Sequence, residues 1–220
     1  MLFDRLMVYE DRAPAGAALN MAIDEALLDY STYPSIRFYG WRRPSVSFGY
    51  FADFAQVERE TPAQEFVRRW TGGGSVPHGQ DLTYSIIIPA SEPTASLGPP
   101  ALYTAVHGAI RAALAAEGRE AMFAPVAVPK ISGGCFANPV RDDLLLDGRK
   151  IAGAAQRRTR RGILHQGSVQ VPDLSHQFRG QFVSFLSTRF ETKEIPTEVL
   201  TRAAQLAAEK YGTKAWLRRR

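Results

Sequence analysis

The Asp147-Gly148 pair, which stands between two apolar runs, is the sequence feature that most constrains the fold. Asp-Gly is a strong signal for a tight β-hairpin turn, because the central residues of that turn need a left-handed backbone. The run DDLLL precedes the pair, and RKIAGAAQRR follows it. The next apolar run, ILHQGSVQV (163–171), predicts a further antiparallel strand.

Earlier in the chain, four runs rich in β-branched and aromatic residues predict more strands. SIRFYGW (35–41) and SVSFGYF (45–51) are joined by the short turn Arg42-Arg43-Pro44. FVRRWT (66–71) and LTYSIIIP (82–89) flank a glycine-rich turn.

Helical spacing of apolar residues predicts three helices, over 17–30, 101–117 and 197–211. In the third, Thr197 is the expected N-cap and Gly212 the C-terminal stop. The stripe of the first helix consists of Leu19, Ala22, Ile23, Ala26, Leu27 and Tyr30. That of the second includes Leu102, Val106, Ile110 and Leu114.

Strands joined by tight turns, with helices grouped between them, predict an α+β fold with a mainly antiparallel sheet. A doubly wound parallel sheet would need regular alternation of strands and helices, which this sequence lacks. The 220 residues show no break in composition and no internal repeat, so we expect one catalytic domain over 1–220, with no C-terminal accessory domain. A monomer is the simplest expectation.

Composition excludes several classes of protein. The chain is 45% hydrophobic and 22% charged, and no apolar run approaches the roughly 18 residues of a membrane span. The N-terminus lacks the apolar core of a signal peptide, which predicts a cytoplasmic protein with no membrane contact. With Cys135 as the single cysteine, an intramolecular disulfide and a cysteine-based zinc cluster are impossible, and no metal is expected.

The formal charge of +5 is concentrated in the arginine runs RRTRR (157–161) and RRR (218–220). Such runs are either a solvated basic surface or a binding surface for an acidic partner. The runs are short and lack interleaved aromatic residues, so nucleic acid is disfavoured and an acidic carrier protein is preferred.

Three segments carry candidate chemistry. In RRWTGGGSVPHGQDLTYS (68–85), three consecutive glycines either form a flexible turn or let a ligand lie against bare backbone. In GRKIAGAAQRRTRRGILHQGS (148–168), Lys150 precedes a run of small residues that leaves space on the strand, although a lysine is more often a solvated charge. In SGGCFANP (132–139), Cys135 lies in an expected loop, either as a small buried apolar residue or as a nucleophile.

These segments, together with ALNMAIDEALL and IRFYGWRRPSVSFGY, resemble the lipoate-protein ligase and octanoyltransferase family. The resemblance runs from about residue 17 to 171, and the ending EKYGTKAWLRRR is also similar. It implies a mixed α+β catalytic domain of the kind shared with biotin ligases. It also implies an acyl pocket between the Arg69–Gly74 turn and the Lys150 strand.

The resemblance implies roles for individual residues. Lys150 would bind the acyl carbonyl, and Cys135 matches the nucleophile of one branch of octanoyltransferases. The implied substrate-binding residues are Arg69, Thr71, Gly72, Gly73, Gly74, Ser75, His78, Gly153, Ala154, Ala155 and His165. The sequence departs from the common family pattern at Ser75, Pro77, Gly79 and Gln80, which affects the expected shape of the site rather than its location.

Two enzymes use this family's scaffold. An octanoyltransferase would take its acyl group from acyl carrier protein through a Cys135 thioester and need no cofactor. A ligase would use ATP and Mg²⁺ to form an acyl-adenylate and would not need the cysteine. Cys135 favours the transferase, and so does the expectation that the chain has no accessory domain. His78 or His165 is the candidate proton acceptor. The acceptor would be a lipoyl-carrier domain, of the 2-oxoacid dehydrogenase E2 or glycine cleavage H protein type.

Other functions remain open at this point. Biotin ligation is weaker, because the glycine-rich segment lacks the arginine-punctuated form of biotin ligases. A catalytically inactive subunit that merely holds acyl carriers is also possible, although such a subunit need keep neither the glycines nor Lys150 and Cys135.

Overall fold

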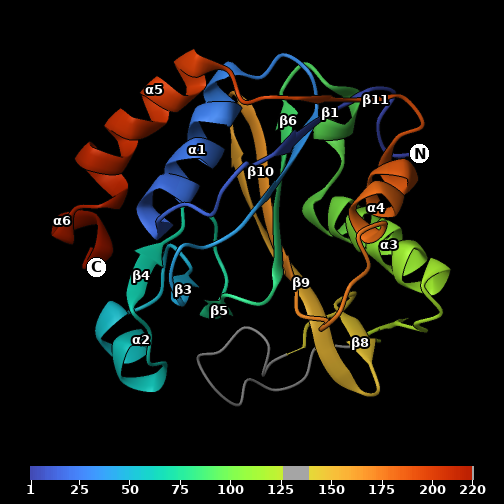
Figure 1. Ribbon diagram of the computed structural model, residues 1–220, viewed down its shortest axis with the longest axis horizontal. Helices are drawn as coiled ribbons and strands as arrows, with labels where there is room; N and C mark the ends of the chain where they lie inside the picture. The colour runs from blue at the N-terminus through green and yellow to red at the C-terminus, as the bar shows by residue number, and fades with distance from the viewer. Residues whose placement is uncertain (126–138, 220) are drawn as a thin grey trace.

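The computed structural model describes residues 1–125 and 139–219 and has one large mixed sheet with helices on both faces (Figure 1). The strands of this sheet are β1 Leu6–Glu10, β2 Ser35–Tyr39, β6 Leu82–Pro89, β7 Met122–Phe123, β8 Leu144–Leu146, β9 Arg149–Thr159, β10 Gly162–Val169 and β11 Phe190–Lys193. Their spatial order is β11-β1-β2-β6-β10-β9-β8-β7. β11, β1 and β2 pair in parallel, and every other neighbouring pair in this order is antiparallel.

A second, smaller sheet has the order β4-β3-β5. It consists of β3 Ser45–Phe48, β4 Glu65–Arg68 and β5 Val76–His78, and the short helix α2 Phe54–Glu60 connects β3 to β4. A small apolar cluster that includes Phe48 and Phe54 joins this helix to the sheet. The glycine-rich turn therefore lies between β4 and β5, not between two strands of the main sheet.

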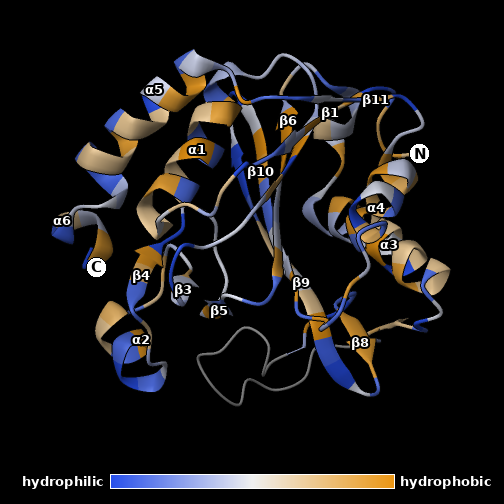
Figure 2. Cartoon of the chain, in the orientation of Figure 1, coloured by the Kyte–Doolittle hydropathy of each residue, from blue (hydrophilic) through white to orange (hydrophobic). Residues whose placement is uncertain are grey.

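Helices cover both faces of the large sheet. They are α1 Ala17–Tyr30, α3 Pro99–Ala116, α4 Phe178–Leu186, α5 Thr197–Leu206, which continues into a π-helical turn Ala207–Tyr211, and α6 Lys214–Leu217; a 3-10 turn spans Pro93–Ser96. α1 and α5 pack on one face and α3 and α4 on the other, each against its own apolar cluster. α5 alternates between hydrophobic and hydrophilic residues along its length (Figure 2), and Val199, Ala203 and Leu206 are its buried residues.

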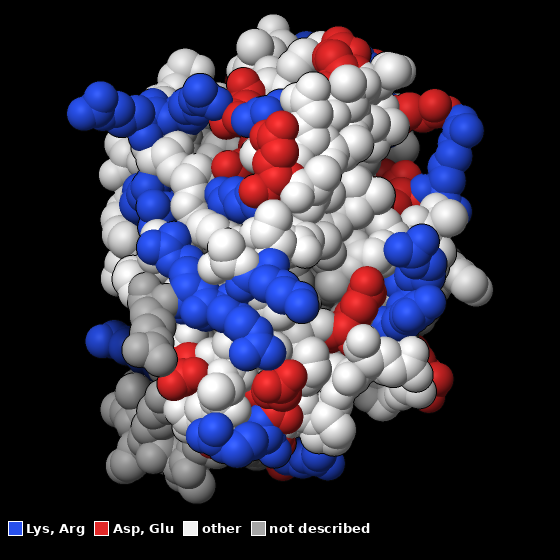
Figure 3. Space-filling view, turned by 90° about the vertical axis from the view of Figure 1, so that its left-hand side faces the viewer, with Lys and Arg blue, Asp and Glu red and all other residues white. Residues whose placement is uncertain are grey.

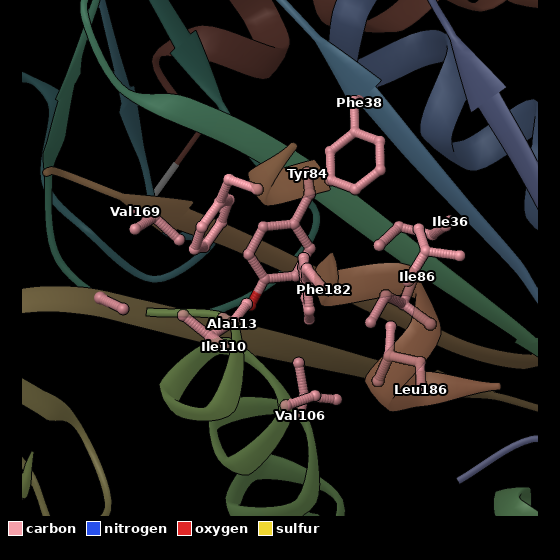
Figure 4. Close-up of a cluster of buried hydrophobic side chains, with 14 of the residues drawn as sticks. Ile36, Phe38, Tyr84, Ile86, Val106, Ile110, Ala113, Val169, Phe182 and Leu186 are labelled. Atoms are coloured by element: carbon pink, nitrogen blue, oxygen red, sulfur yellow. The ribbon is translucent and has the colours of Figure 1, made fainter. Parts of the chain in front are cut away.

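The core beneath α3 and α4 follows directly from the apolar spacing of the sequence. Leu102, Val106, Ile110 and Leu114 are completely buried, as the predicted stripe of the second helix requires. Figure 4 shows Tyr84 of β6 in the middle of this cluster, with Phe182 of α4 on one side. The Tyr84 and Phe182 rings meet edge to face with centroids 5.2 Å apart.

The structure confirms the α+β fold and the Asp147-Gly148 hairpin, whose two residues have φ of 50° and 74°. Thr197, however, is not an N-cap: Pro196 holds the non-helical N-cap position, so Thr197 is already helical. Gly212 ends the π-helical turn as expected. On α1, Tyr30 is 47% exposed, because the helix ends at that residue and its side chain reaches Glu198 at the surface.

Candidate active site

The glycine-rich turn is organised around the buried guanidinium of Arg69. Nη2 of Arg69 donates to the carbonyls of Gly72 at 2.9 Å and Gly74 at 3.0 Å, and Nη1 donates to Oγ of Ser47 at 2.8 Å. Gly73 has φ of +90°, a conformation that side chains disfavour. The Arg69 guanidinium thus holds the glycine backbone in one conformation, so the turn is ordered and not a flexible linker.

Thr71 connects this turn to a buried polar network under α1. Its Oγ1 donates to Oε1 of Gln166 at 2.8 Å, and Nε2 of Gln166 donates to Oδ2 of Asp24 at 2.7 Å. Asp24 forms an ion pair with Arg37, with 2.7 Å between Oδ1 and Nη1 and no exposure of either side chain. Burial raises the pKa of Asp24, against the opposing effect of Arg37. Ser75 is also buried.

A pocket lies between the two sheets and α1. Its walls are Met21, Tyr39, Trp41, Ser47, Arg69, Val76, His78, Thr83, Gly153, Ala154, Ala155, Gln166, Gly167 and Ser168. Its volume is about 30 Å³, enough for a few waters. A larger guest would need wall side chains to move, and Met21 is an unbranched, adaptable side chain in that wall.

His78 forms one end of this pocket and is held on three sides. Its ring stacks on Trp41 with centroids 4.1 Å apart and an interplanar angle of 13°. Nδ1 lies 2.8 Å from Oδ2 of Asp81, and Nε2 lies 2.6 Å from Oγ of Ser47. Burial lowers the pKa of His78, although Asp81 opposes this shift. A neutral ring with its proton on Nδ1 satisfies both contacts, since it donates to Asp81 and accepts from Ser47.

Lys150 forms a buried ion pair beside Gly153, a residue that lines the pocket. Its side chain is 2% exposed, and Nζ lies 2.7 Å from Oδ2 of Asp143, whose side chain has no exposure. The lysine folds over Gly153, where an added Cβ would lie 2.7 Å from Cε and 2.9 Å from Nζ of Lys150. Because Gly153 lines the pocket, the missing side chain at this position places the ammonium beside the pocket.

The structure separates His165 from the pocket. Its neighbour on β10, Gln166, lines the pocket, and successive strand residues point to opposite faces. The imidazole instead lies in the core, with Nε2 3.5 Å from the hydroxyl of Tyr84 and Nδ1 without a hydrogen-bond partner among the described residues. Burial lowers the pKa of His165 to about 3, so the ring is neutral.

Apart from Lys150, the expected site residues thus fall into four groups. Arg69, His78 and the Gly153–Ala155 stretch line the pocket, while Thr71 to Ser75 form the turn behind it. His165 faces the core. Cys135 lies outside the described residues, so its approach to Lys150 stays a prediction.

Several residues of the site were missed by the sequence reasoning. Asp81 lies inside the 68–85 segment, and Asp143 lies between the Cys135 and Lys150 segments. Trp41, Gln166 and Met21 line the pocket. A signal for Asp143 exists: an acidic residue beside an apolar strand is costly to bury unless a cation meets it. Lys150, on the other arm of the hairpin, is that cation.

Within residues 1–125 and 139–219, no three His, Cys, Asp or Glu side chains are grouped so that they could hold a metal ion. None of the helices described there is long and apolar enough to cross a membrane.

Comparison with known proteins gives one family. The model of the lipoyl protein ligase A/B catalytic domain matches residues 16–210. Octanoyltransferase LipM of Geobacillus kaustophilus is 38% identical over 174 residues, which are 69% of this chain and 60% of that protein. Octanoyltransferase LipM of Bacillus subtilis is 35% identical over 175 residues, 72% of this chain and 63% of that protein. The match therefore spans less than two thirds of the length of these relatives.

Two solved structures show the same fold. A lipoate-protein ligase A bound with ATP superposes with a TM-score of 0.74 at 21% identity, over 98% of each chain. The bi-partite lipoate protein ligase of Thermoplasma acidophilum superposes with a TM-score of 0.72 at 20% identity, over 98% of this chain and 96% of that one.

Proposed function

Since the chain belongs to the lipoyl protein ligase A/B catalytic-domain family, we propose that it moves an octanoyl (or lipoyl) group from acyl carrier protein, through a thioester on Cys135, to a lysine of a lipoyl-carrier domain. The observation that carries this proposal is the ammonium of Lys150 folded over Gly153 at the wall of the pocket. The octanoyltransferase relatives support the choice of acyl group.

The reaction has two steps. The Cys135 thiolate attacks the carbonyl of the acyl carrier thioester, and the bond to the phosphopantetheine sulfur breaks as that thiol leaves. The unprotonated amine of the target lysine then attacks the acyl-enzyme; the bond to the Cys135 sulfur breaks, and the nitrogen gives one proton to the departing thiolate as the amide forms. Lys150 stabilises the thiolate and then the oxyanion of each tetrahedral intermediate. An amide replaces a thioester, so the transfer proceeds without ATP.

The pocket supplies the site for the acyl chain. Met21, Tyr39, Trp41 and Val76 give it apolar walls, and the small residues Gly153, Ala154 and Ala155 of β9 line it beside Lys150. Of the two candidate proton acceptors, His78 lines the pocket and His165 lies in the core. Both ring nitrogens of His78 already have partners, so we assign it to the end wall of the pocket and not to proton transfer.

A basic face next to the pocket supports an acidic carrier as the partner. Figure 3 shows Lys and Arg side chains gathered on the face that carries α5 and α6. A hollow on the surface is lined by five arginines, Arg157, Arg158, Arg160, Arg161 and Arg202, with the carboxylates of Glu25 and Asp29. Ala155 lines the pocket only two residues before Arg157 on the same strand. A negatively charged domain docked here would approach the pocket from the side of Ala155.

The test of the thioester route is incubation with octanoyl-acyl carrier protein followed by intact-protein mass spectrometry. We expect one octanoyl adduct on the wild type, removed by added lipoyl-carrier domain, and none on Cys135→Ala. Full transfer by Cys135→Ala without an adduct would contradict the route. Modification from free lipoate that requires ATP and Mg²⁺ would identify a ligase instead. Carrier binding without any turnover would identify an inactive carrier-binding subunit.

The docking surface has its own test. Arg160→Glu combined with Arg202→Glu is expected to raise KM for the carrier about tenfold at low salt, with kcat nearly unchanged. Arg111→Glu combined with Arg179→Glu, the same change in net charge on α3 and α4 across the sheet, is the control. Equal effects of the two variants would show that net charge matters and the hollow does not.

A further inference from the structure

We propose that Asp143 is the positioning residue of the Lys150 ammonium, and that helix α3 holds Asp143 in place. This inference rests on the proposed function, because it concerns the lysine that the acyl transfer uses. Nothing in the apolar stripe of α3 indicates such a role, since the residues that carry it lie on a different side of the helix from Leu102 and Val106.

The carboxylate of Asp143 is completely buried and receives several donors. Oδ2 lies 2.7 Å from Nζ of Lys150 and accepts a hydrogen bond from the backbone N–H of Val140 at 2.6 Å. Oδ1 accepts a hydrogen bond from the hydroxyl of Tyr103. The same hydroxyl accepts from the backbone N–H of Ala154 at 3.3 Å, on the strand that lines the pocket. A buried anion with its lone pairs satisfied in this way has a fixed position.

Side chains of helix α3 form hydrogen bonds to the turn that carries Asp143. Besides the Tyr103 contact, Oγ1 of Thr104 donates to Oδ2 of Asp142 at 2.8 Å, and Nδ1 of His107 lies 2.8 Å from the carbonyl of Asp142. Asp142 has φ of 67°, a left-handed conformation that needs such support. Tyr103 and His107 are four residues apart and therefore share one face of the helix.

The protonation states of this cluster agree with its geometry. Burial lowers the pKa of His107 to about 4, so the ring is neutral and donates from Nδ1 to the Asp142 carbonyl. Burial, with the nearby Asp143 charge, raises the pKa of Tyr103, so its hydroxyl stays a donor. The described titratable groups that face the pair are therefore Tyr103 and His107 from α3 and Asp142 from the turn.

The consequence for the reaction is electrostatic. A buried ammonium without a counter-charge gives up its proton readily, because burial penalises the charged form. Asp143 holds the ammonium over Gly153, so that the donor is in place when negative charge develops on sulfur or oxygen. Asp143 itself touches no reacting atom and acts through Lys150.

The central test is Asp143→Asn, which keeps the size of the side chain and removes its charge. We expect kcat for octanoyl transfer to fall roughly thirtyfold, with KM for the carrier within about twofold. The alkaline limb of the pH–rate profile is expected to move to lower pH by about one unit or more, since the lysine loses its proton sooner. Asp143→Glu, which restores the charge, is expected to recover part of kcat and of the alkaline limb.

A matched control lies in the same hairpin. Asp147→Asn makes the same chemical change at an exposed turn residue, and asparagine tolerates the left-handed backbone there. It is expected to leave kcat and the pH profile at wild-type values. Tyr103→Phe removes one donor to Asp143 and is expected to lower kcat about threefold.

The decisive measurement compares Asp143→Asn in two backgrounds. If Asp143 acts through Lys150, its substitution has no further effect on the residual rate of Lys150→Ala, and the two effects are not additive. Additive effects, or an unchanged alkaline limb in Asp143→Asn, would overturn the inference. Failure of the wild type to transfer octanoyl at all would instead overturn the proposed function, so the two failures are distinguishable.

Discussion

Two buried ion pairs stand near the pocket, and they differ in the cation that each uses. Arg37 and Asp24 have no exposed side-chain surface, and Lys150 and Asp143 have almost none. The guanidinium of Arg37 makes five hydrogen bonds, two to Asp11, two to Asn20 and one to Asp24. Burial opposes the charge of Arg37, but Asp24 and Asp11 raise its pKa above the ordinary value.

This difference distinguishes a buried charge that stabilises the fold from one that is placed for catalysis. The five donors of an arginine are all used at Arg37, so this cation ties α1 to β2 and to the segment after β1. A lysine carries a compact charge on a flexible stem, and Lys150 bends over a glycine at the pocket wall. We therefore expect substitutions at the first pair to change stability and those at the second to change catalysis.

The largest effect is expected for Lys150→Met. Loss of the ammonium removes the stabilisation of the thiolate and the oxyanion, so kcat should fall about a thousandfold, or ~4 kcal/mol in activation free energy. Single-turnover transfer from octanoyl-carrier measures this, with far-UV circular dichroism to verify the fold. A folded variant with more than a tenth of the wild-type rate would contradict a catalytic Lys150.

Arg37→Lys should have the opposite profile. The ammonium cannot reproduce the paired contacts to Asp11 and Asn20, so the free energy of unfolding should fall by about 3 kcal/mol. Urea denaturation measures it, and kcat of the folded variant should stay within about threefold of wild type. A strong loss of kcat at low temperature, where the variant is folded, would erase the distinction between the two pairs.

Acid should lower the free energy of unfolding through His107, which holds the turn next to the Lys150 ion pair. The pKa of His107 is lowered by burial to about 4 from an ordinary value of 6.5, so the unfolded chain takes up its proton first as the pH falls. Its contribution to stability is present above pH 6.5 and decreases towards pH 4. Between pH 6.5 and 5 the loss is about 2 kcal/mol. Urea titrations at pH 7 and 5 should show a smaller difference for His107→Asn than for wild type.

The smallest effect is expected at an exposed pair. Arg161 and Asp29 form an ion pair in which the arginine is 64% exposed. Arg161→Ala should leave the free energy of unfolding close to the wild-type value, because solvent screens the charges. A loss comparable with that of Arg37→Lys would mean that burial is not what separates these pairs.

The sequence predicted the elements that carry the site better than the side chains that contact the site residues. Local signals were sufficient for the Asp147-Gly148 hairpin, for α1 and for the glycine-rich turn, since each depends on neighbouring residues. Lys150 followed from the same hairpin. The Asp143 contact does not follow from counting back across the turn, because Lys150 pairs with Leu145 and the register shifts between Leu144 and Leu145.

Long-range packing decided what the sequence could not. Alternation along β10 places either His165 or Gln166 at the pocket, but the sequence does not indicate which face is buried against α3. In the same way, Tyr103, Thr104 and His107 read as ordinary helix residues until the fold brings the turn at Asp142 against them. Cys135 lies outside the described residues, and its role remains to be tested by the adduct experiment.

The side chain of Lys150 fills the space above Gly153, so one added methyl group at this position would displace it. Alanine there would push the lysine aside without touching a hydrogen bond of the strand, since a Cβ would meet Cε of Lys150 at 2.7 Å. The Gly153→Ala variant should therefore fold and still bind its carriers, but transfer their acyl group slowly. Such a variant would serve as a trap, holding each carrier long enough for the complex to be isolated and identified.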